Sequence, residues 1–151
     1  MRFYFAYGAN MDVETMSSRC RNARPIGAAI LSRHRFVIME PGFANVLRDG
    51  RHAVHGVLWK LPFADLPALD RYEDVHLGLY RKEVRAVSSA NGAVVAAMLY
   101  VGATPARADP APGYLENILD SATRWRMPPR YIRHLESMLA VADREPRALQ
   151  A

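Results

Sequence analysis

The stretch Phe-Tyr-Phe-Ala-Tyr-Gly-Ala-Asn at residues 3–10 decides the fold. Apolar side chains occupy both faces of the strand predicted over residues 3–7, which is typical of a strand in the middle of a core. Gly8 ends the strand, and Asp12 is suitably placed to be the N-cap of a short helix that reaches residue 19 or 20. The chain therefore begins with a buried strand that turns directly into a helix.

Apolar runs predict further strands in the first half of the chain. Residues 26–39 indicate one long bent strand or two short ones, and residues 45–47 indicate another. Asp49-Gly50 is a turn signal followed by the Val- and Leu-rich run 53–61. We therefore expect a hairpin-like connection at residues 49–50.

The second half predicts a helix and then a hairpin. Apolar residues at three-residue spacing predict a helix over residues 63–73. Charged and apolar residues alternate over 80–87, Asn91-Gly92 is a two-residue turn signal, and residues 93–101 supply the return strand.

Two apolar stripes at helical spacing, beginning at Tyr114 and Tyr131, predict two final helices. A chain of 151 residues, half of them hydrophobic, is long enough to bury a core and is not disordered. We expect a single α+β domain over residues 1–142 and a frayed tail over 143–151. Its sheet is predicted to be mixed, with six or seven strands flanked by helices.

The charge balance is basic, with 20 Lys and Arg against 15 Asp and Glu. The arginines are scattered and form no recognised nucleic-acid motif, so a solvated basic surface is favoured over a nucleic-acid partner. The longest nearly unbroken apolar run, residues 93–101, is about half of the roughly 20 residues that a membrane-spanning helix needs. No membrane segment is expected, and the N-terminus lacks a secretory signal, so we expect a cytoplasmic location.

The cysteine and histidine pattern does not favour a metal site. Cys20 is the only cysteine. Its basic neighbours Arg19 and Arg21 are compatible with a nucleophilic cysteine, but they are equally well explained by surface charge. His52 and His55 have an odd spacing, which on a strand sends side chains to opposite faces. We therefore expect no zinc pair there.

The turn Tyr7-Gly8-Ala9-Asn10 is the first candidate for chemistry. A strand that turns into a helix through glycine exposes backbone N–H groups without intrahelical partners, and such a turn can hold an anion. Glycine permits a positive φ, and the short Ala9 leaves room above the main chain. On these residues alone, a plain strand-to-helix turn is the more common explanation.

Glu73 is the second candidate. At about 100° per residue, Leu66, Leu69 and Glu73 fall within about 60° of one another, on the core-facing stripe of the predicted helix. A buried carboxylate needs a cation, hydrogen bonds, a raised pKa or a cleft, and one with a raised pKa in a cleft is suited to general acid–base catalysis. A cap or salt bridge at the helix end is the structural alternative.

Several motifs occur in a particular order along most of the chain. They are Tyr7-Gly8-Ala9-Asn10-Met11, Gly56-Val57-Leu58-Trp59, Leu69 through Glu73, Gly78-Leu79-Tyr80-Arg81, and Pro112-Gly113-Tyr114-Leu115. Each motif is weak alone, but their order and spacing resemble the gamma-glutamylcyclotransferase-like family, which includes the AIG2-like proteins.

The resemblance implies a small mixed β-barrel flanked by helices, with no metal and no organic cofactor. It implies a small-molecule γ-glutamyl substrate whose α-amino group attacks its own γ-carbonyl, so that an amine leaves and 5-oxoproline forms. Glu73 would be the catalytic acid and base, and Tyr7 to Asn10 would bind the glutamyl end. Tyr80 and Tyr114 would line the pocket.

One residue departs from the family pattern, because Ala9 stands where the family turn usually has serine. The hydroxyl is lost while the backbone N–H remains, which puts any binding through that hydroxyl in doubt. A non-catalytic domain that binds a small ligand or a partner on the same scaffold is the alternative function. The sequence leaves open which amine is released and the oligomeric state.

Overall fold

Strand β1 (Arg2–Ala6) closes the barrel that forms the centre of the molecule. It pairs antiparallel with β3 along its whole length and meets β5 in parallel, with Tyr4 opposite Met98. Tyr4, Phe5 and Ala6 are buried. Both faces of this strand are therefore covered, as its apolar sequence predicts.

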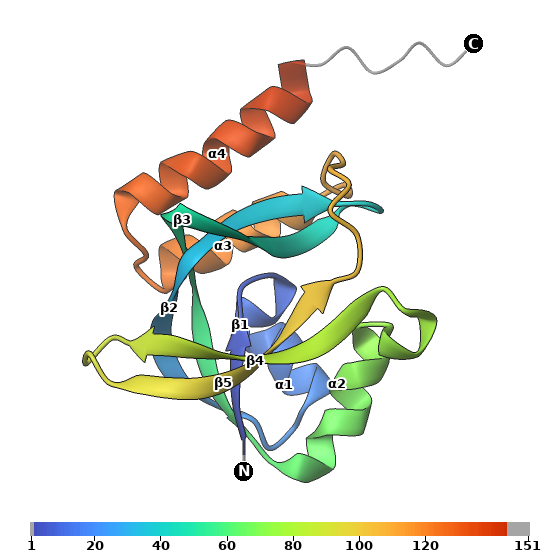
Figure 1. The fold of residues 1–151 in the computed structure, drawn as a ribbon, viewed down its shortest axis with the longest axis vertical. Coiled ribbons are helices and arrows are strands. Elements are labelled where there is room, and N and C mark those ends of the chain that lie inside the picture. The colour runs from blue at the N-terminus through green and yellow to red at the C-terminus, as the bar shows by residue number, and fades with distance from the viewer. Residues whose placement is uncertain (1, 145–151) are drawn as a thin grey trace.

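The computed structural model describes residues 2–144, and side chains are described for residues 2–139. The strands follow the order β1-β3-β2-β4-β5 around a closed barrel, with the helices outside it (Figure 1). The other elements, in chain order, are the 3-10 helix η1 (Ala9–Met11), α1 (Val13–Arg19), β2 (Arg24–Met39), β3 (Phe43–Leu61), the 3-10 helix η2 (Phe63–Asp65), α2 (Leu66–Tyr72), the 3-10 helix η3 (Val75–Leu77), β4 (Tyr80–Ser89), β5 (Val94–Gly102), α3 (Tyr114–Arg124) and α4 (Pro129–Arg144).

The prediction of an α+β barrel with helices is confirmed, but the described residues contain five strands rather than six or seven. Two long strands, β2 and β3, replace the three or four shorter ones that the sequence predicts. The hairpin expected at Asp49-Gly50 is wrong, because β3 continues through these residues as a bulge in which residues 49–52 lie opposite Arg33 alone. The chain turns earlier, at residues 40–42.

The β4–β5 hairpin is confirmed, with Tyr80 opposite Gly102 at one end and Ser88 opposite Val94 at the other. Its connecting loop has three residues, 90–92, rather than two. Gly92 takes a left-handed conformation there, with φ 85°, which is typical of a three-residue hairpin loop.

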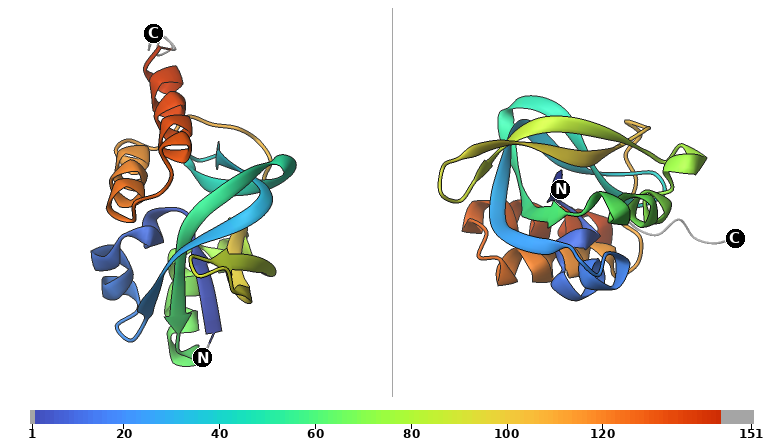
Figure 2. Two further views of the ribbon diagram at one scale, coloured as in Figure 1. Left: turned by 90° about the vertical axis from the view of Figure 1, so that its left-hand side faces the viewer. Right: turned by 90° about the horizontal axis from the view of Figure 1, so that it is seen from below.

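The helix signals locate the helices correctly. The N–H of Thr15 donates to Asp12 Oδ2 at 2.9 Å, so Asp12 caps α1 as predicted. The helix expected over residues 63–73 begins as a 3-10 turn, and α2 then ends at Tyr72 with Glu73 as its C-cap. Helices α1, α3 and α4 lie on one side of the barrel (Figure 2).

His52 and His55 point to the same side of β3, which corrects the expectation of opposite faces. The His52 ring lies 6.3 Å from that of His134, and the His55 ring lies 4.8 Å from that of Tyr131. Both partners belong to α4. His52 belongs to the bulge at residues 49–52, whereas His55 lies in the regularly paired part of β3, so strict alternation does not hold between them.

No helix within residues 2–144 is both long and apolar enough to cross a bilayer. The expected tail, residues 143–151, lies outside the described residues from position 145 onward. The single domain over residues 1–142 stays a prediction.

Gly56 of β3 lies against β1 with no room for a side chain. A Cβ at this position would lie 2.4 Å from the Ala6 carbonyl oxygen and 2.7 Å from Phe5 Cζ. Gly56→Ala is therefore expected to lower the free energy of unfolding by about 1–3 kcal/mol, measured by urea denaturation. Gly50→Ala on the same strand is the control, because nothing lies within 4 Å of a Cβ there. Equal stability of the two variants would contradict this packing.

Candidate active site

A pocket of about 200 Å³, open to solvent on one side, lies where β1 passes into η1. The β1–η1 turn, the ends of α1 and α2, and strands β3, β4 and β5 provide its walls. The structure brings all seven of the predicted site residues to this one pocket, namely Tyr7, Gly8, Ala9, Asn10, Glu73, Tyr80 and Tyr114. Residues separated by more than 100 positions in the sequence thus share one pocket.

Glu73 lies in this pocket because of its position at the end of α2. Its backbone N–H donates to the Leu69 carbonyl at 3.1 Å, which fixes it as the helix C-cap. Burial raises the pKa of its carboxyl group to about 7, against the opposing effect of the Arg19 guanidinium, while Asp74 adds to the rise. The carboxyl group can therefore give and take a proton near neutral pH.

Asn10 holds the Glu73 carboxylate in place. The Asn10 side chain is 3% exposed, and its Nδ2 donates to Glu73 Oε1 at 3.2 Å and to the Tyr4 hydroxyl at 3.0 Å. Its Oδ1 accepts from Arg19 Nη1 at 2.6 Å. Because the amide oxygen is occupied by a cation, the amide nitrogen is turned toward the carboxylate.

Arg19 is a pocket residue that the sequence analysis assigned to the surface. Its guanidinium lies 4.7 Å from the centre of the Tyr72 ring as well as against Asn10. The last turn of α1 brings it there, next to the end of α2. No local sequence signal indicates this contact, because it depends on how two helices pack.

Gly8 is required for close approach rather than for a positive φ. Its backbone has φ −119° and ψ −134°. A Cβ there would lie 2.9 Å from the Tyr114 hydroxyl and 3.4 Å from Ala44 Cβ. The expected use of glycine for a left-handed conformation is therefore wrong, and the reason for glycine at this position is the tyrosine packed against it.

The main chain of the turn has N–H donors without a protein acceptor, and they belong to residues that line the pocket. The N–H groups of Met11 and Asp12 donate back to the carbonyls of Gly8 and Ala9. Within the described residues, the N–H groups of Gly8 and Asn10 donate to no protein acceptor. The turn can thus provide hydrogen bonds to an anionic group, as its sequence predicts.

Three tyrosine hydroxyls of the pocket are hydrogen-bonded to the main chain. Tyr7 donates to the carbonyl of Tyr100, and Tyr80 donates to the carbonyl of Ala44. Tyr114 differs, because its hydroxyl accepts from the Ala44 N–H at 3.1 Å. Its own proton has no acceptor among the hydrogen bonds of the described residues, and burial raises its pKa to about 12, so this group stays a neutral donor.

Asp70 connects α2 to the barrel. Its carboxylate accepts from the Tyr100 hydroxyl at 2.6 Å and from Lys82 Nζ at 2.8 Å. Tyr100 also lines the pocket. These contacts fix the end of α2, and so the position of Glu73, against β4 and β5.

Sequence reasoning missed part of the pocket lining. The additional lining residues are Tyr4, Arg19, Phe43, Ala44, Tyr72, Asp74, Leu79 and Tyr100. Among the side chains of residues 2–139, no three His, Cys, Asp or Glu gather where they could hold a metal ion. The polar groups of the pocket are instead the carboxyl groups of Glu73 and Asp74, the Asn10 amide, an arginine, tyrosine hydroxyls and backbone N–H donors.

Comparisons with known proteins agree with this architecture. A model of the AIG2-like family matches residues 53–135. The chain is 27% identical over 145 residues to a Bos taurus protein and 26% identical to a Homo sapiens protein, both named gamma-glutamylcyclotransferase, covering 89% of this chain and 77% of each relative. A solved structure named gamma-glutamyl cyclotransferase superposes with a TM-score of 0.86 at 24% identity, covering 99% of this chain and 91% of that one. The fold is therefore that of these proteins.

The raised pKa of Glu73 predicts how stability depends on pH. The unfolded chain loses this proton near pH 4.5 and the folded protein near pH 7, so the folded state binds more protons between these values. Stability is therefore expected to fall as pH rises through this window, by roughly 3 kcal/mol at pH 8 if Glu73 acts alone. Glu73→Gln should remove this loss, which urea denaturation at pH 5 and pH 8 measures.

Glu14→Gln is the matched control for this experiment, because Glu14 is an exposed carboxylate on α1. It should keep the pH dependence of the unaltered protein. If Glu73→Gln and Glu14→Gln lose the same stability between pH 5 and pH 8, the Glu73 carboxyl group does not titrate near 7.

Proposed function

Because the chain belongs to the AIG2-like family, we propose that it is a gamma-glutamylcyclotransferase-type enzyme, which releases an amine from a γ-glutamyl amide and forms 5-oxoproline. The observation that carries the proposal is the Glu73 carboxyl group, which has a pKa of about 7 and lines the same pocket as the turn that bears unpaired N–H donors. A reaction that moves protons from one nitrogen to another needs such a group.

Glu73 performs the proton transfers in this mechanism. Its carboxylate accepts a proton from the substrate's α-ammonium group, and the free amine attacks the γ-carbonyl carbon. A new C–N bond closes the five-membered ring, the protonated Glu73 returns its proton to the leaving nitrogen, and the original amide C–N bond breaks. The ring nitrogen then gives up its second proton to the regenerated Glu73 carboxylate, which passes it to the released amine, so that a neutral lactam and an ammonium ion are formed. Because nucleophile and electrophile belong to one molecule, the enzyme needs mainly to fold the substrate and move protons.

Two kinds of hydrogen-bond donor in the pocket bind the oxygen atoms of the substrate. The N–H groups of Gly8 and Asn10 bind the α-carboxylate, which is why the absence of a hydroxyl at Ala9 is tolerated. The Tyr114 hydroxyl, which keeps its proton and lies against Gly8, donates to the γ-carbonyl oxygen as negative charge develops there. The sequence alone gives no indication of such a donor.

The size of the pocket suits the glutamyl half of the substrate. Its volume of about 200 Å³ is below the roughly 300–1,000 Å³ typical of pockets for drug-sized ligands. The released amine then lies toward the solvent-open side. The proposal therefore defines the glutamyl end of the substrate and leaves the identity of the amine to experiment.

The decisive experiment incubates the purified protein with glutathione, γ-glutamyl amino acids and γ-glutamyl polyamines and measures 5-oxoproline by mass spectrometry. At least one compound should be converted. Glu73→Gln should reduce turnover by about 10²–10⁴-fold, the usual contribution of general acid–base catalysis, with an unchanged circular dichroism spectrum. Glu14→Gln should keep full activity. If the unaltered protein converts none of these compounds, it is a binding or adaptor domain on the same scaffold.

The pH dependence of the reaction tests the part played by Arg19. Because the substrate's ammonium proton passes to ionised Glu73, kcat/KM should rise with pH and level off above about pH 7. The Arg19 cation lowers the pKa of Glu73, so Arg19→Gln should move this rise to higher pH. A pH–rate profile of each protein measures the shift. An unchanged or downward-shifted profile in Arg19→Gln would exclude this electrostatic role.

A further inference from the structure

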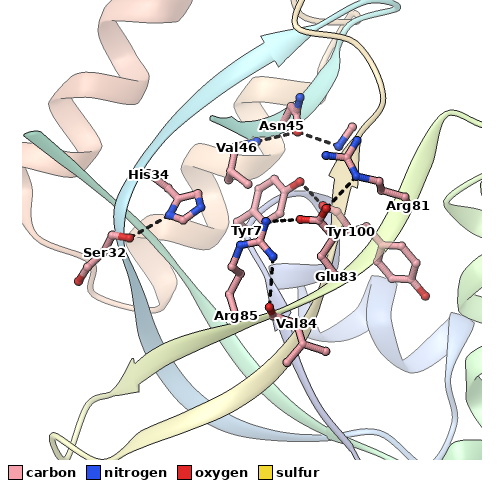
Figure 3. A network of polar contacts seen from close by, with 11 residues as sticks. Tyr7, Ser32, His34, Asn45, Val46, Arg81, Glu83, Val84, Arg85 and Tyr100 are labelled. Atoms are coloured by element: carbon pink, nitrogen blue, oxygen red, sulfur yellow. Dashed lines mark hydrogen bonds and ion pairs between the residues drawn. The ribbon is translucent and has the colours of Figure 1, made fainter. Parts of the chain in front are cut away.

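A second cleft, of about 300 Å³, lies between the β2–β3 arm and the β4–β5 hairpin. Strands β2 and β4 pair only at Ala29–Ser89 and Ile30–Ser88, so the arm and the hairpin separate beyond Ile30. Figure 3 shows the polar side chains of this region: His34 extends from β2, while Arg81, Glu83 and Arg85 extend from β4. The first pocket and its mechanism use none of these side chains.

Positive charge is in excess in this cleft. Arg48, Arg81 and Arg85 line it, and its lining includes no Asp or Glu. The nearby carboxylate is Glu83, whose Oε1 accepts from Arg81 Nε at 2.8 Å and whose Oε2 pairs with Arg85 Nη2. One carboxylate therefore pairs with two of the three guanidiniums, and the three arginines together with Glu83 carry a net charge of +2.

Several donors in the cleft are unused by the protein. Arg48 forms no ion pair with a carboxylate of the described residues. Arg85 Nε is buried and, within the same residues, has no hydrogen-bond partner. A buried donor without an acceptor is costly, and an anion in the cleft would satisfy it.

The floor of the cleft is rigid and separates it from the first pocket. Asn45 is 1% exposed, and its Oδ1 accepts from the backbone N–H groups of Val46 and Gly102, both at 2.8 Å. Its Nδ2 donates to the Thr104 carbonyl at 3.3 Å. The preceding residue, Ala44, lines the first pocket, so neighbouring residues of β3 face the two cavities.

We propose that this cleft binds a small oxyanion carrying two negative charges, such as a phosphate group or a dicarboxylate. Guanidinium groups present paired N–H donors that match both phosphate and carboxylate oxygens. A dianion would balance the net charge of +2 of the three arginines and Glu83, and it would provide an acceptor for Arg85 Nε. The volume of the cleft is that of a site for a small molecule rather than a surface for a macromolecule.

The test is isothermal titration calorimetry of inorganic phosphate into the full-length protein at pH 8, with ionic strength held constant by sodium chloride. We expect saturable binding at one site, weakened about tenfold by Arg48→Gln, because charge-assisted hydrogen bonds from arginine are the strong ones. Arg51→Gln is the matched control, since Arg51 is exposed on the same strand and does not line the cleft. It removes the same charge and should bind phosphate as the unaltered protein does.

A parallel titration with malonate identifies the ligand chemistry. Binding of phosphate alone assigns the cleft to a phosphoryl group, binding of malonate alone assigns it to a dicarboxylate, and binding of both supports recognition of either. Two results would overturn the proposal: no saturable heat with either anion, or equal weakening by Arg48→Gln and Arg51→Gln. These readouts do not involve turnover, so they are independent of the cyclotransferase activity.

Discussion

The hydrogen bond from the Asn10 amide to the Glu73 carboxylate is the contact on which the pocket depends. It joins the turn after β1 to the end of α2, and the same amide also binds the Tyr4 hydroxyl and the Arg19 guanidinium. Each of these groups is oriented by its neighbours, so the loss of any one would leave a buried polar atom without a partner. The carboxylate is thereby held inside the pocket rather than at the surface.

The burial that suits Glu73 to proton transfer also lowers the stability of the folded protein when Glu73 is ionised. Burial raises the pKa of Glu73 to about 7, which means that the ionised form is disfavoured in the folded protein. A single nearby cation, Arg19, reduces this penalty without forming a direct salt bridge in the described residues. A stronger pair would lower the pKa of the carboxyl group and make its carboxylate a weaker proton acceptor. The indirect contact through Asn10 keeps both protonation states within reach.

The two cavities differ in chemistry although they share one strand. Ala44 faces a pocket of tyrosines and a protonatable carboxyl group, whereas Asn45 forms the floor of a cleft lined by arginines. Consecutive segments of β3 meet the two cavities, because residues 43 and 44 line the first and residues 45–48 line the second. The β2–β3 arm separates from the β4–β5 hairpin beyond Ile30, and the second cleft lies between them.

The sequence alone predicts a structural feature correctly where a few neighbouring residues determine it. The capping residue Asp12 starts α1, and Asn91-Gly92 marks the β4–β5 turn. The same holds for the inward position of Glu73, because the spacing of apolar residues on one short helix defines its buried face. The turn from Tyr7 to Asn10 was also recognisable, although glycine is needed there for packing against Tyr114 and not for its backbone angles.

Only the tertiary structure decided the features that depend on pairing between distant segments. Asp49-Gly50 has the composition of a hairpin turn, yet pairing with β2 on both sides makes it a bulge, and His52 in this bulge lies against α4, as His55 does. The sequence alone predicts neither the contact of Arg19 with Asn10 nor the hydroxyl proton of Tyr114 that has no acceptor within the described residues, because each depends on how separate elements pack together. Short-range patterns carry no information on such contacts, and the closure of the barrel brings them together.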